Sequence, residues 1–263
     1  MNVTYDFGGR VALVTGGGSG IGRASAEAFG RAGATVAVAD ISLPSAEATV
    51  GAIRAAGGAA HAYRADVSAP EAVRGLITDI VADLGGLDFA HNNAGIEGEH
   101  VPTADIAIDD WRRVVDIDLN AVFYCMKAEI EVMALRGHGV IVNTSSASGL
   151  IGGYNLGAYT AAKHGVIGLT KAAAADHARS GVRINAVCPG AIDTPFIAEL
   201  PPAALQRLML GTPMDRAGQP DEIAQGVLWL CSDGASYVTG TALSIDGGVL
   251  IGGTGTRFDD IEF

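Results

Sequence analysis

A tyrosine and a lysine, Tyr159 and Lys163, are four positions apart in a helix-like stretch of the chain. Residues i and i+4 share one face of a helix, so this spacing holds an ammonium group beside a phenol. A phenol titrates near pH ~10, and a neighbouring cation favours its ionised form. The pair could therefore exchange a proton with an alcohol or a carbonyl. The same spacing also occurs where a half-buried tyrosine simply lies beside a solvated lysine, so the rest of the chain has to decide.

Two further polar residues are candidates for the same chemistry. Ser146 follows a run rich in Val and Ile, and its hydroxyl could donate a hydrogen bond to a substrate oxygen. Asn120 is a polar residue in an otherwise apolar helical stretch. A buried amide needs hydrogen-bond partners, so Asn120 could hold a water chain or could be a satisfied amide of the core.

A glycine-rich segment, Thr-Gly-Gly-Gly-Ser-Gly-Ile-Gly, spans residues 15–22 between an apolar run and a helical stretch. Glycines let a ligand approach the main chain closely, and the N–H groups of a helix N-terminus attract a pyrophosphate. The segment therefore predicts a dinucleotide site rather than a simple turn. Its candidate binding residues are Gly16, Gly18, Ser19, Gly20, Ile21 and Gly22.

The next apolar runs also end in candidate cofactor residues. Asp40 ends the second run, where a carboxylate can accept the adenosine-ribose hydroxyls and would repel a 2′-phosphate; a turn or N-cap aspartate is the alternative. Because Ser19 offers no cation for that phosphate, we expect NAD. Asp66 and Val67 end the third run and could contact adenine. Asn93 follows the fourth, where its amide could contact the cofactor or tie loops together.

A proline and a glycine, Pro189 and Gly190, follow the sixth apolar run and force a turn. The backbone of Ile192 and the hydroxyl of Thr194 lie just beyond that turn. We expect these residues to fix the carboxamide of a nicotinamide ring and so to choose the ring face that exchanges hydride.

These candidates require a scaffold, and the chain supplies one by alternating short apolar runs with helical stretches. Most runs show little polar alternation, which is typical of strands buried on both faces of a parallel sheet. The pattern predicts a Rossmann-type α/β fold: a doubly wound parallel sheet of about seven strands with helices on both faces. The expected strands are 10–15, 35–39, 59–65, 87–91, 140–144, 183–187 and 242–245, and the longest expected helices are 109–136 and 158–180.

Composition supports one folded domain over residues 1–263, with residues 251–263 as a tail. The chain is 49% hydrophobic and 17% charged and holds 37 glycines, which argues against disorder. Its net charge of −12 disfavours nucleic acid as a partner. We expect no membrane span, because no apolar run is long enough. Three scattered cysteines and the lack of a signal peptide favour the cytoplasm, and no metal site is expected.

Taken together, the ordered motifs resemble the short-chain dehydrogenase/reductase family over roughly residues 7–250. The motifs are residues 15–22, Asn-Asn-Ala-Gly at 92–95, Asn120, Ser146, Tyr-x-x-x-Lys at 159–163, Pro-Gly at 189–190 and residues 237–248. The resemblance implies an NAD(H)-dependent oxidoreductase that assembles as a homotetramer or a dimer. It also implies that Tyr159 is the general acid/base, that Ser146 polarises the substrate oxygen, and that Lys163 binds the nicotinamide ribose and lowers the tyrosine pKa. Asn120 would hold a water relay to Lys163.

The family usually grips its substrate with three segments, which correspond here to 96–101, 147–156 and 195–212. These segments are mainly apolar, and the first two contain no arginine or lysine. We therefore predict an uncharged secondary or cyclic alcohol, or a diol, and its ketone, contacted by Ser146, Tyr154 and Phe196. The residue pattern of the whole chain is loosely similar to that of cyclic-diol dehydrogenases. The alternatives are an NAD-dependent epimerase or dehydratase and a non-catalytic NAD-sensing protein.

Overall fold

Seven parallel strands form one sheet in the order β3-β2-β1-β4-β5-β6-β7. The computed structural model describes residues 3–198 and 211–251, so most of the expected substrate segment 195–212 and of the expected tail lie outside the described residues. The strand order, which reverses between β1 and β4, confirms the predicted doubly wound sheet. The strands are β1 (Val11–Thr15), β2 (Thr35–Asp40), β3 (Ala59–Arg64), β4 (Phe89–Asn92), β5 (Gly139–Thr144), β6 (Val182–Pro189) and β7 (Ala242–Ile245).

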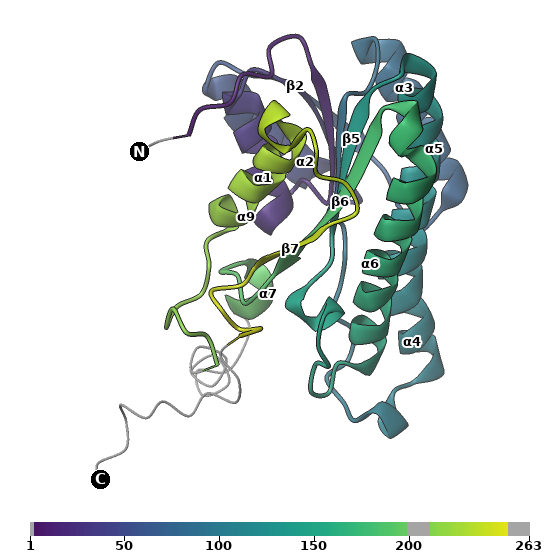
Figure 1. Cartoon of the computed structure of the whole chain (residues 1–263), viewed down its shortest axis with the longest axis vertical. Coiled ribbons are helices and arrows are strands. Elements are labelled where there is room, and N and C mark those ends of the chain that lie inside the picture. Colours follow the sequence, from purple (N-terminus) through teal and green to yellow (C-terminus); the bar gives the residue numbers. More distant parts are fainter. Residues whose placement is uncertain (1–2, 199–210, 252–263) are drawn as a thin grey trace.

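Helices cover both faces of the sheet, as Figure 1 shows. One face carries α1 (Gly20–Arg31), α2 (Leu43–Ala55) and α9 (Pro220–Cys231). The other face carries α3 (Pro70–Leu84), α4 (Ile108–Val115), α5 (Ala121–Arg136) and α6 (Gly157–His177). The short helix α7 (Pro195–Ala198) follows β6. Each strand therefore leads into a loop at the same carboxyl edge, where ligands bind in open α/β sheets.

Local sequence signals set several of these helix ends. Ser42 is the N-cap of α2 and accepts a hydrogen bond from the backbone of Ser45 at 3.4 Å. Helices α3 and α5 end at Gly85 and Gly137, which adopt the left-handed conformation with φ of 83° and 72°. These caps and glycines make the helix boundaries readable from the sequence.

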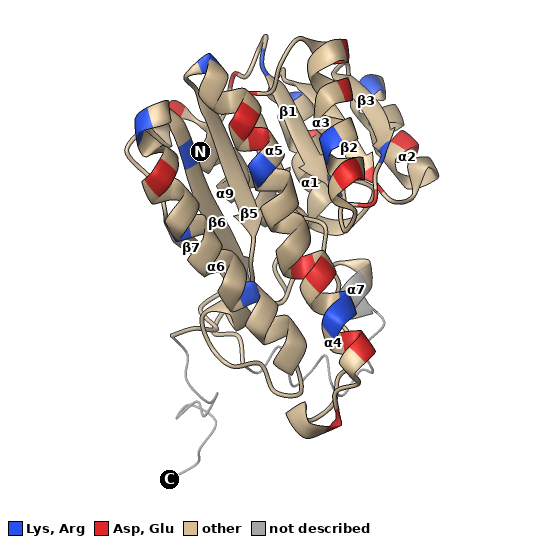
Figure 2. Cartoon of the chain, turned by 90° about the vertical axis from the view of Figure 1, so that its right-hand side faces the viewer, with Lys and Arg blue, Asp and Glu red and all other residues tan. Residues whose placement is uncertain are grey.

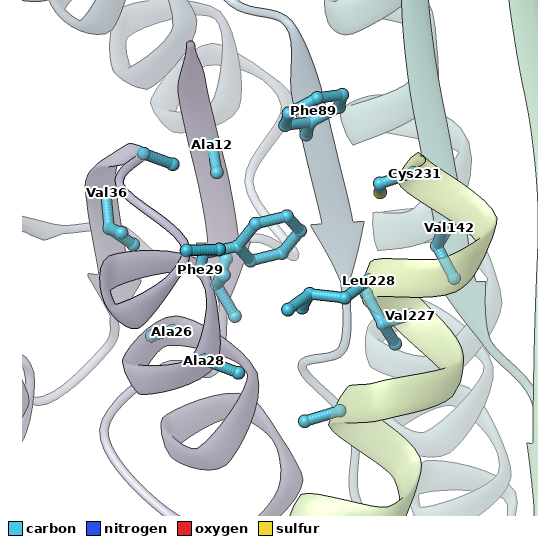
Figure 3. Packing of buried hydrophobic residues seen from close by; sticks show 14 of the residues in the cluster. Ala12, Ala26, Ala28, Phe29, Val36, Phe89, Val142, Val227, Leu228 and Cys231 are labelled. Carbon is cyan, nitrogen blue, oxygen red and sulfur yellow. The ribbon is translucent and has the colours of Figure 1, made fainter. Parts of the chain in front are cut away.

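Two apolar layers fill the space between the sheet and its helices. Figure 3 shows the first layer, in which Phe29 of α1 and Leu228 of α9 pack near Phe89 of β4. The rings of Phe29 and Phe89 stack with centroids 5.9 Å apart. Burial of such a side chain stabilises the fold by about 1.5–3 kcal/mol. The second layer, on the other face, joins Leu13 and Ile141 to α3, α5 and α6.

The long helix expected over residues 109–136 is interrupted by a π-helical turn, Asp116–Asn120. A π turn holds an extra residue, and such turns are frequent at functional sites. Here it places Asp118 on the same buried side as Val114 of α4 and Val122 of α5. The sequence suggested one regular helix, so the turn is a departure from that expectation.

Within the described residues, no helix is both long and apolar enough to cross a membrane. The same residues contain no group of three or more His, Cys, Asp or Glu that could hold a metal ion. The three cysteines, Cys125, Cys188 and Cys231, are buried and free.

Candidate active site

Helix α6 brings Tyr159 and Lys163 to the carboxyl edge of the sheet, next to the end of β5. The Lys163 Nζ atom lies 5.4 Å from the centre of the Tyr159 ring. It donates a hydrogen bond to the carbonyl oxygen of Thr144 at 3.2 Å. Ser146, just after β5, lies beside the Tyr159 side chain and lowers the pKa of its phenol. The structure thus brings together the three residues that the spacing and the strand ends suggested.

The protonation of Tyr159 reflects several opposing effects. Burial is the largest, and it raises the pKa of the phenol above its usual value near 10. Lys163 and Ser146 lower that pKa, while the carboxylates of Asp118 and Glu97 raise it. The expected influence of Lys163 is therefore present, but the protein's own groups together leave the pKa of Tyr159 raised rather than lowered.

The π turn presents Asp118, rather than Asn120, to Lys163. The Asp118 Oδ2 atom lies 3.2 Å from Lys163 Nζ, and the two side chains are 0% and 3% exposed. The alignment is that of an ion pair rather than of a well-directed hydrogen bond. The other oxygen of Asp118 accepts the backbone N–H of Ile96 at 2.8 Å.

Asn120 therefore requires a correction to the expected site. Its side chain is half-buried and donates to Asp116 Oδ1 at 2.8 Å, one turn back on the exposed side of the helix. Positions 118 and 120 point in different directions because they are only two residues apart in a helical turn. A signal for Asp118 was present, since it lies four residues from both Val114 and Val122 on the buried stripe.

The ion pair changes the titration of both partners. Burial alone would lower the pKa of Lys163, but Asp118 and Tyr159 raise it above its usual value. Burial raises the pKa of Asp118, and Lys163 and the Ile96 N–H oppose that rise. Each charge is therefore stable in the interior because the other is present.

The glycine-rich loop of residues 15–22 is shaped for close approach of backbone and ligand. Gly16 has a φ of +61°, and a Cβ atom there would lie 2.9 Å from Ala94 Cα. A Cβ atom on Gly22 would collide with the carbonyl oxygen of Gly16. Ser19 is the N-cap of α1 but makes no side-chain capping bond, and the first turn of α1 carries no acidic residue. This helix N-terminus suits the phosphates of a dinucleotide.

Asp40 ends β2 and lies against the same loop. Its Oδ2 accepts the backbone N–H of Gly18 at 2.9 Å, and its Oδ1 accepts the N–H of Ser42 at 2.9 Å. A Cβ atom on Gly18 would lie 2.8 Å from that carboxylate. The half-buried carboxylate thus shapes the loop that would receive the adenosine half of a dinucleotide.

The two other adenosine-side candidates differ in their surroundings. Asp66 is exposed, and its Oδ1 accepts the backbone N–H and the hydroxyl of Ser68 at 3.0 and 2.6 Å, while Val67 is half-buried. Asn93 instead ties the end of β4 to the glycine loop, because its Nδ2 donates to the carbonyl oxygen of Thr15 at 3.3 Å. The loop-tying alternative for Asn93 is therefore a real contact.

The segment after β6 also reaches the glycine loop. β6 ends at Pro189, and a Cβ atom on Gly190 would lie 2.8 Å from the backbone of Asp246. Ile192 is buried and pairs with Gly218 in an isolated bridge. The Thr194 methyl group would lie 3.3 Å from a Cβ atom on Gly20. The predicted nicotinamide side of the site therefore adjoins the predicted phosphate side, where Ile21 packs on the first apolar layer.

The three predicted substrate contacts differ in where the structure places them. Ser146 lies beside Tyr159. Tyr154, in the loop before α6, is 92% exposed. Phe196 belongs to α7, but its side chain and residues 199–210 of the expected substrate segment lie outside the described residues.

Comparisons with known proteins identify the family. The family model described as enoyl-(acyl carrier protein) reductase matches residues 16–250 of this chain. A cyclohexanol dehydrogenase of Acinetobacter sp. (strain SE19) is 48% identical over 241 residues, which cover 92% of this chain and 95% of the relative. The chain belongs to the short-chain dehydrogenase/reductase family. That family was the one expected from the motifs, and it is a family of oxidoreductases.

Other relatives agree with this assignment. A 2,5-dichloro-2,5-cyclohexadiene-1,4-diol dehydrogenase of Sphingobium indicum is 44% identical, and the match covers 92% of this chain and 98% of the relative. The crystal structure of an NAD+-bound xylitol dehydrogenase superposes with a TM-score of 0.89 at 35% identity, covering 92% of this chain and 99% of that one. Sequence and architecture therefore point to the same family.

Proposed function

We propose that this protein is an NAD(H)-dependent dehydrogenase that interconverts an uncharged secondary or cyclic alcohol, or a diol, with its ketone. One observation carries the proposal: Tyr159, flanked by Lys163 and Ser146, lies at the same sheet edge as the glycine loop. The names of the relatives, a cyclohexanol dehydrogenase and a cyclohexadiene-diol dehydrogenase, support a ring alcohol as the substrate.

In the oxidative direction, the Tyr159 phenolate accepts the proton of the substrate hydroxyl, and Ser146 donates a hydrogen bond to the same oxygen. When bound, NAD supplies the acceptor for the hydride that leaves the carbinol carbon. Lys163 favours the phenolate and would hold the nicotinamide ribose. In the reductive direction, Tyr159 returns its proton to the carbonyl oxygen, so that the alcohol forms.

Replacement of the phenol tests this assignment. Tyr159→Phe should lower turnover of a panel of secondary and cyclic alcohols, cyclohexanol included, by at least about 10³-fold. NADH binding, followed by fluorescence, should stay within about twofold because the ring remains. Tyr237→Phe is the matched control, since Tyr237 is fully exposed. Near-normal turnover in Tyr159→Phe would refute the proposed role of this residue.

The choice of NAD over NADP is part of the proposal. It is supported by the Asp40 carboxylate beside Gly18 and by the absence of any lysine or arginine in residues 15–22. A negative charge at this position would repel a 2′-phosphate. The ratio of kcat/KM for the two cofactors tests the choice, and a ratio that favours NADP would contradict it.

We also propose a single domain over residues 1–263, a cytoplasmic location and a homotetramer, with a dimer as the smaller alternative. The free cysteines support the location. Trp111 of α4 and Phe123 and Leu135 of α5 are exposed apolar residues that a partner subunit could cover. Figure 2 shows acidic and basic residues close together along the same helices. Sedimentation of the full chain as a monomer would refute the assembly.

A further inference from the structure

The ion pair of Asp118 and Lys163 is almost fully buried, with side chains 0% and 3% exposed. Lys163 Nζ also contacts the Thr144 carbonyl and lies over the Tyr159 ring. The backbone of Gly95 lies against the pair, because a Cβ atom there would lie 3.3 Å from both Asp118 Oδ1 and Lys163 Nζ. Water is thus largely kept from the pair, so its charges act on Tyr159 with little screening.

We propose that Asp118 is a positioning residue that, through Lys163, sets the pH at which the Tyr159–Lys163 pair releases its proton and so moves the working range of the enzyme to the alkaline side. The proposal rests on the proposed function, since it concerns the acid/base of that reaction. It assigns to the π turn a role in regulating proton transfer, without direct contact between Asp118 and the substrate.

The charges of the three groups determine the pH at which the first proton leaves. With Asp118 ionised, the carboxylate, the ammonium and the neutral phenol sum to zero, and loss of a proton leaves a net negative charge in the interior. Without the carboxylate the pair begins with a net positive charge, and loss of a proton leaves it neutral. Because the phenol and the ammonium are coupled, the first proton leaves at lower pH in the second case, whichever group releases it.

Other groups face the same cluster from each neighbouring element. Glu97, in the loop after β4, is half-buried, and its nearest partner is His100; it also raises the pKa of Tyr159. Cys188 of β6 has a pKa raised by burial to about 11, so its thiol stays neutral at working pH. Asp116, in the π turn itself, is exposed and bonded to Asn120. Among the carboxylates of the described chain, Asp118 is the one in ionic contact with Lys163.

The first test uses the pH dependence of alcohol oxidation. Asp118→Asn removes the charge and keeps the size of the side chain, and Asp116→Asn removes an exposed carboxylate from the same turn. The acidic limb of kcat/KM, measured with NAD and cyclohexanol or the best alcohol of the panel, should move to lower pH by at least about one unit in Asp118→Asn. It should move by less than about 0.3 unit in Asp116→Asn, since exposed charges are screened. Equal profiles in the two variants would overturn the proposal.

A second test does not depend on turnover. The chain has six tyrosines and three lysines, so [13Cζ]tyrosine and [13Cε]lysine labels can report Tyr159 and Lys163 directly by NMR. In the unsubstituted protein neither group should release its proton at a lower pH than the free side chain does, and an earlier release from either would overturn the proposal even if no variant folds. In Asp118→Asn the first release should fall by at least about one unit. If this shift appears while Tyr159→Phe remains active, the proposed function fails and the electrostatic role stands.

Discussion

Two buried carboxylates near opposite edges of the sheet are neutralised in different ways. Asp118, near the carboxyl edge, has one cation among the described residues, Lys163, and both side chains are almost fully buried. Asp88, just before β4 at the amino edge, is 4% exposed but is surrounded by basic side chains that reach into solvent. Those side chains are Arg10, Arg136 and His138, at 3.2, 3.7 and 3.6 Å.

The difference separates a structural charge from a functional one. Asp88 also accepts the backbone N–H of Val11 at 2.9 Å, and so it joins the start of β1 to the start of β4. Its exposed partners can replace one another, and each contributes little alone. Asp118 and Lys163 cannot be replaced in this way, because loss of either leaves a charge buried without a partner.

The largest effect on stability should come from removal of the single cation. Lys163→Met should lower the free energy of unfolding by about 3–5 kcal/mol at pH 8, since the Asp118 carboxylate loses its buried partner. Urea unfolding measures the change. Lys171→Met, at an exposed position on the same helix, should change it by less than about 0.5 kcal/mol. A loss below about 1 kcal/mol in Lys163→Met would mean that the pair is not neutralised as described.

A third buried carboxylate sharpens the comparison, because no cation of the described residues forms an ion pair with it. Glu129 of α5 is completely buried and accepts a hydrogen bond from Asn92 at 2.9 Å. Burial raises its pKa to about 8, and the bond from Asn92 lowers it only in part. The folded state therefore binds this proton more tightly than the unfolded state. The stabilisation is complete below pH ~4.5 and is lost as the pH rises towards 8.

Glu129→Gln should remove most of this pH dependence. The free energy of unfolding of the unsubstituted protein should fall by about 4 kcal/mol between pH 5 and pH 9, and the variant should show a much flatter profile over the same range. Glu131→Gln, at an exposed position on the same helix, should keep the original slope. If Glu129→Gln retains the original slope, Glu129 is not the source of the pH dependence.

The smallest effect on stability should come from a substitution beside Asp88, at the amino edge of the sheet. Arg10→Met should lower the free energy of unfolding by about 0.5 kcal/mol and leave turnover unchanged, because Arg136 and His138 remain near Asp88. Thermal unfolding measures the change in stability, and the alcohol assay measures turnover. A loss above about 2 kcal/mol would show that the three basic side chains are not interchangeable and would weaken the contrast between the two edges.

Much of this arrangement was readable from local sequence. The Val- and Ile-rich runs predicted all seven strands to within about two residues, and the glycine segment marked the N-terminus of α1. The ends of β1, β2, β4, β5 and β6 bring their candidate residues to one edge because parallel strands share a direction. These features depend on neighbouring residues, so a pattern can reveal them.

The features that depend on three-dimensional packing could not be predicted in the same way. A regular helical period gave no sign of the π turn. The spacing from Val114 and Val122 placed Asp118 on the buried stripe, but only packing shows that it is the residue that contacts Lys163. The pKa of Tyr159 was expected to fall beside Lys163, but burial, which only tertiary structure defines, raises it. The Glu129 site joins α5 to β4 and is likewise a product of packing.

The π turn has a consequence for changes in chain length. The extra residue between Val115 and Ala121 sets the rotation of α4 relative to α5. A deletion there would rotate one helix against the other by about 100°, the turn made by one residue. Asp118 would then leave the buried stripe. We therefore expect this short stretch to tolerate substitutions on its outer side far better than single-residue deletions, which makes its length a more stringent requirement than most of its side chains.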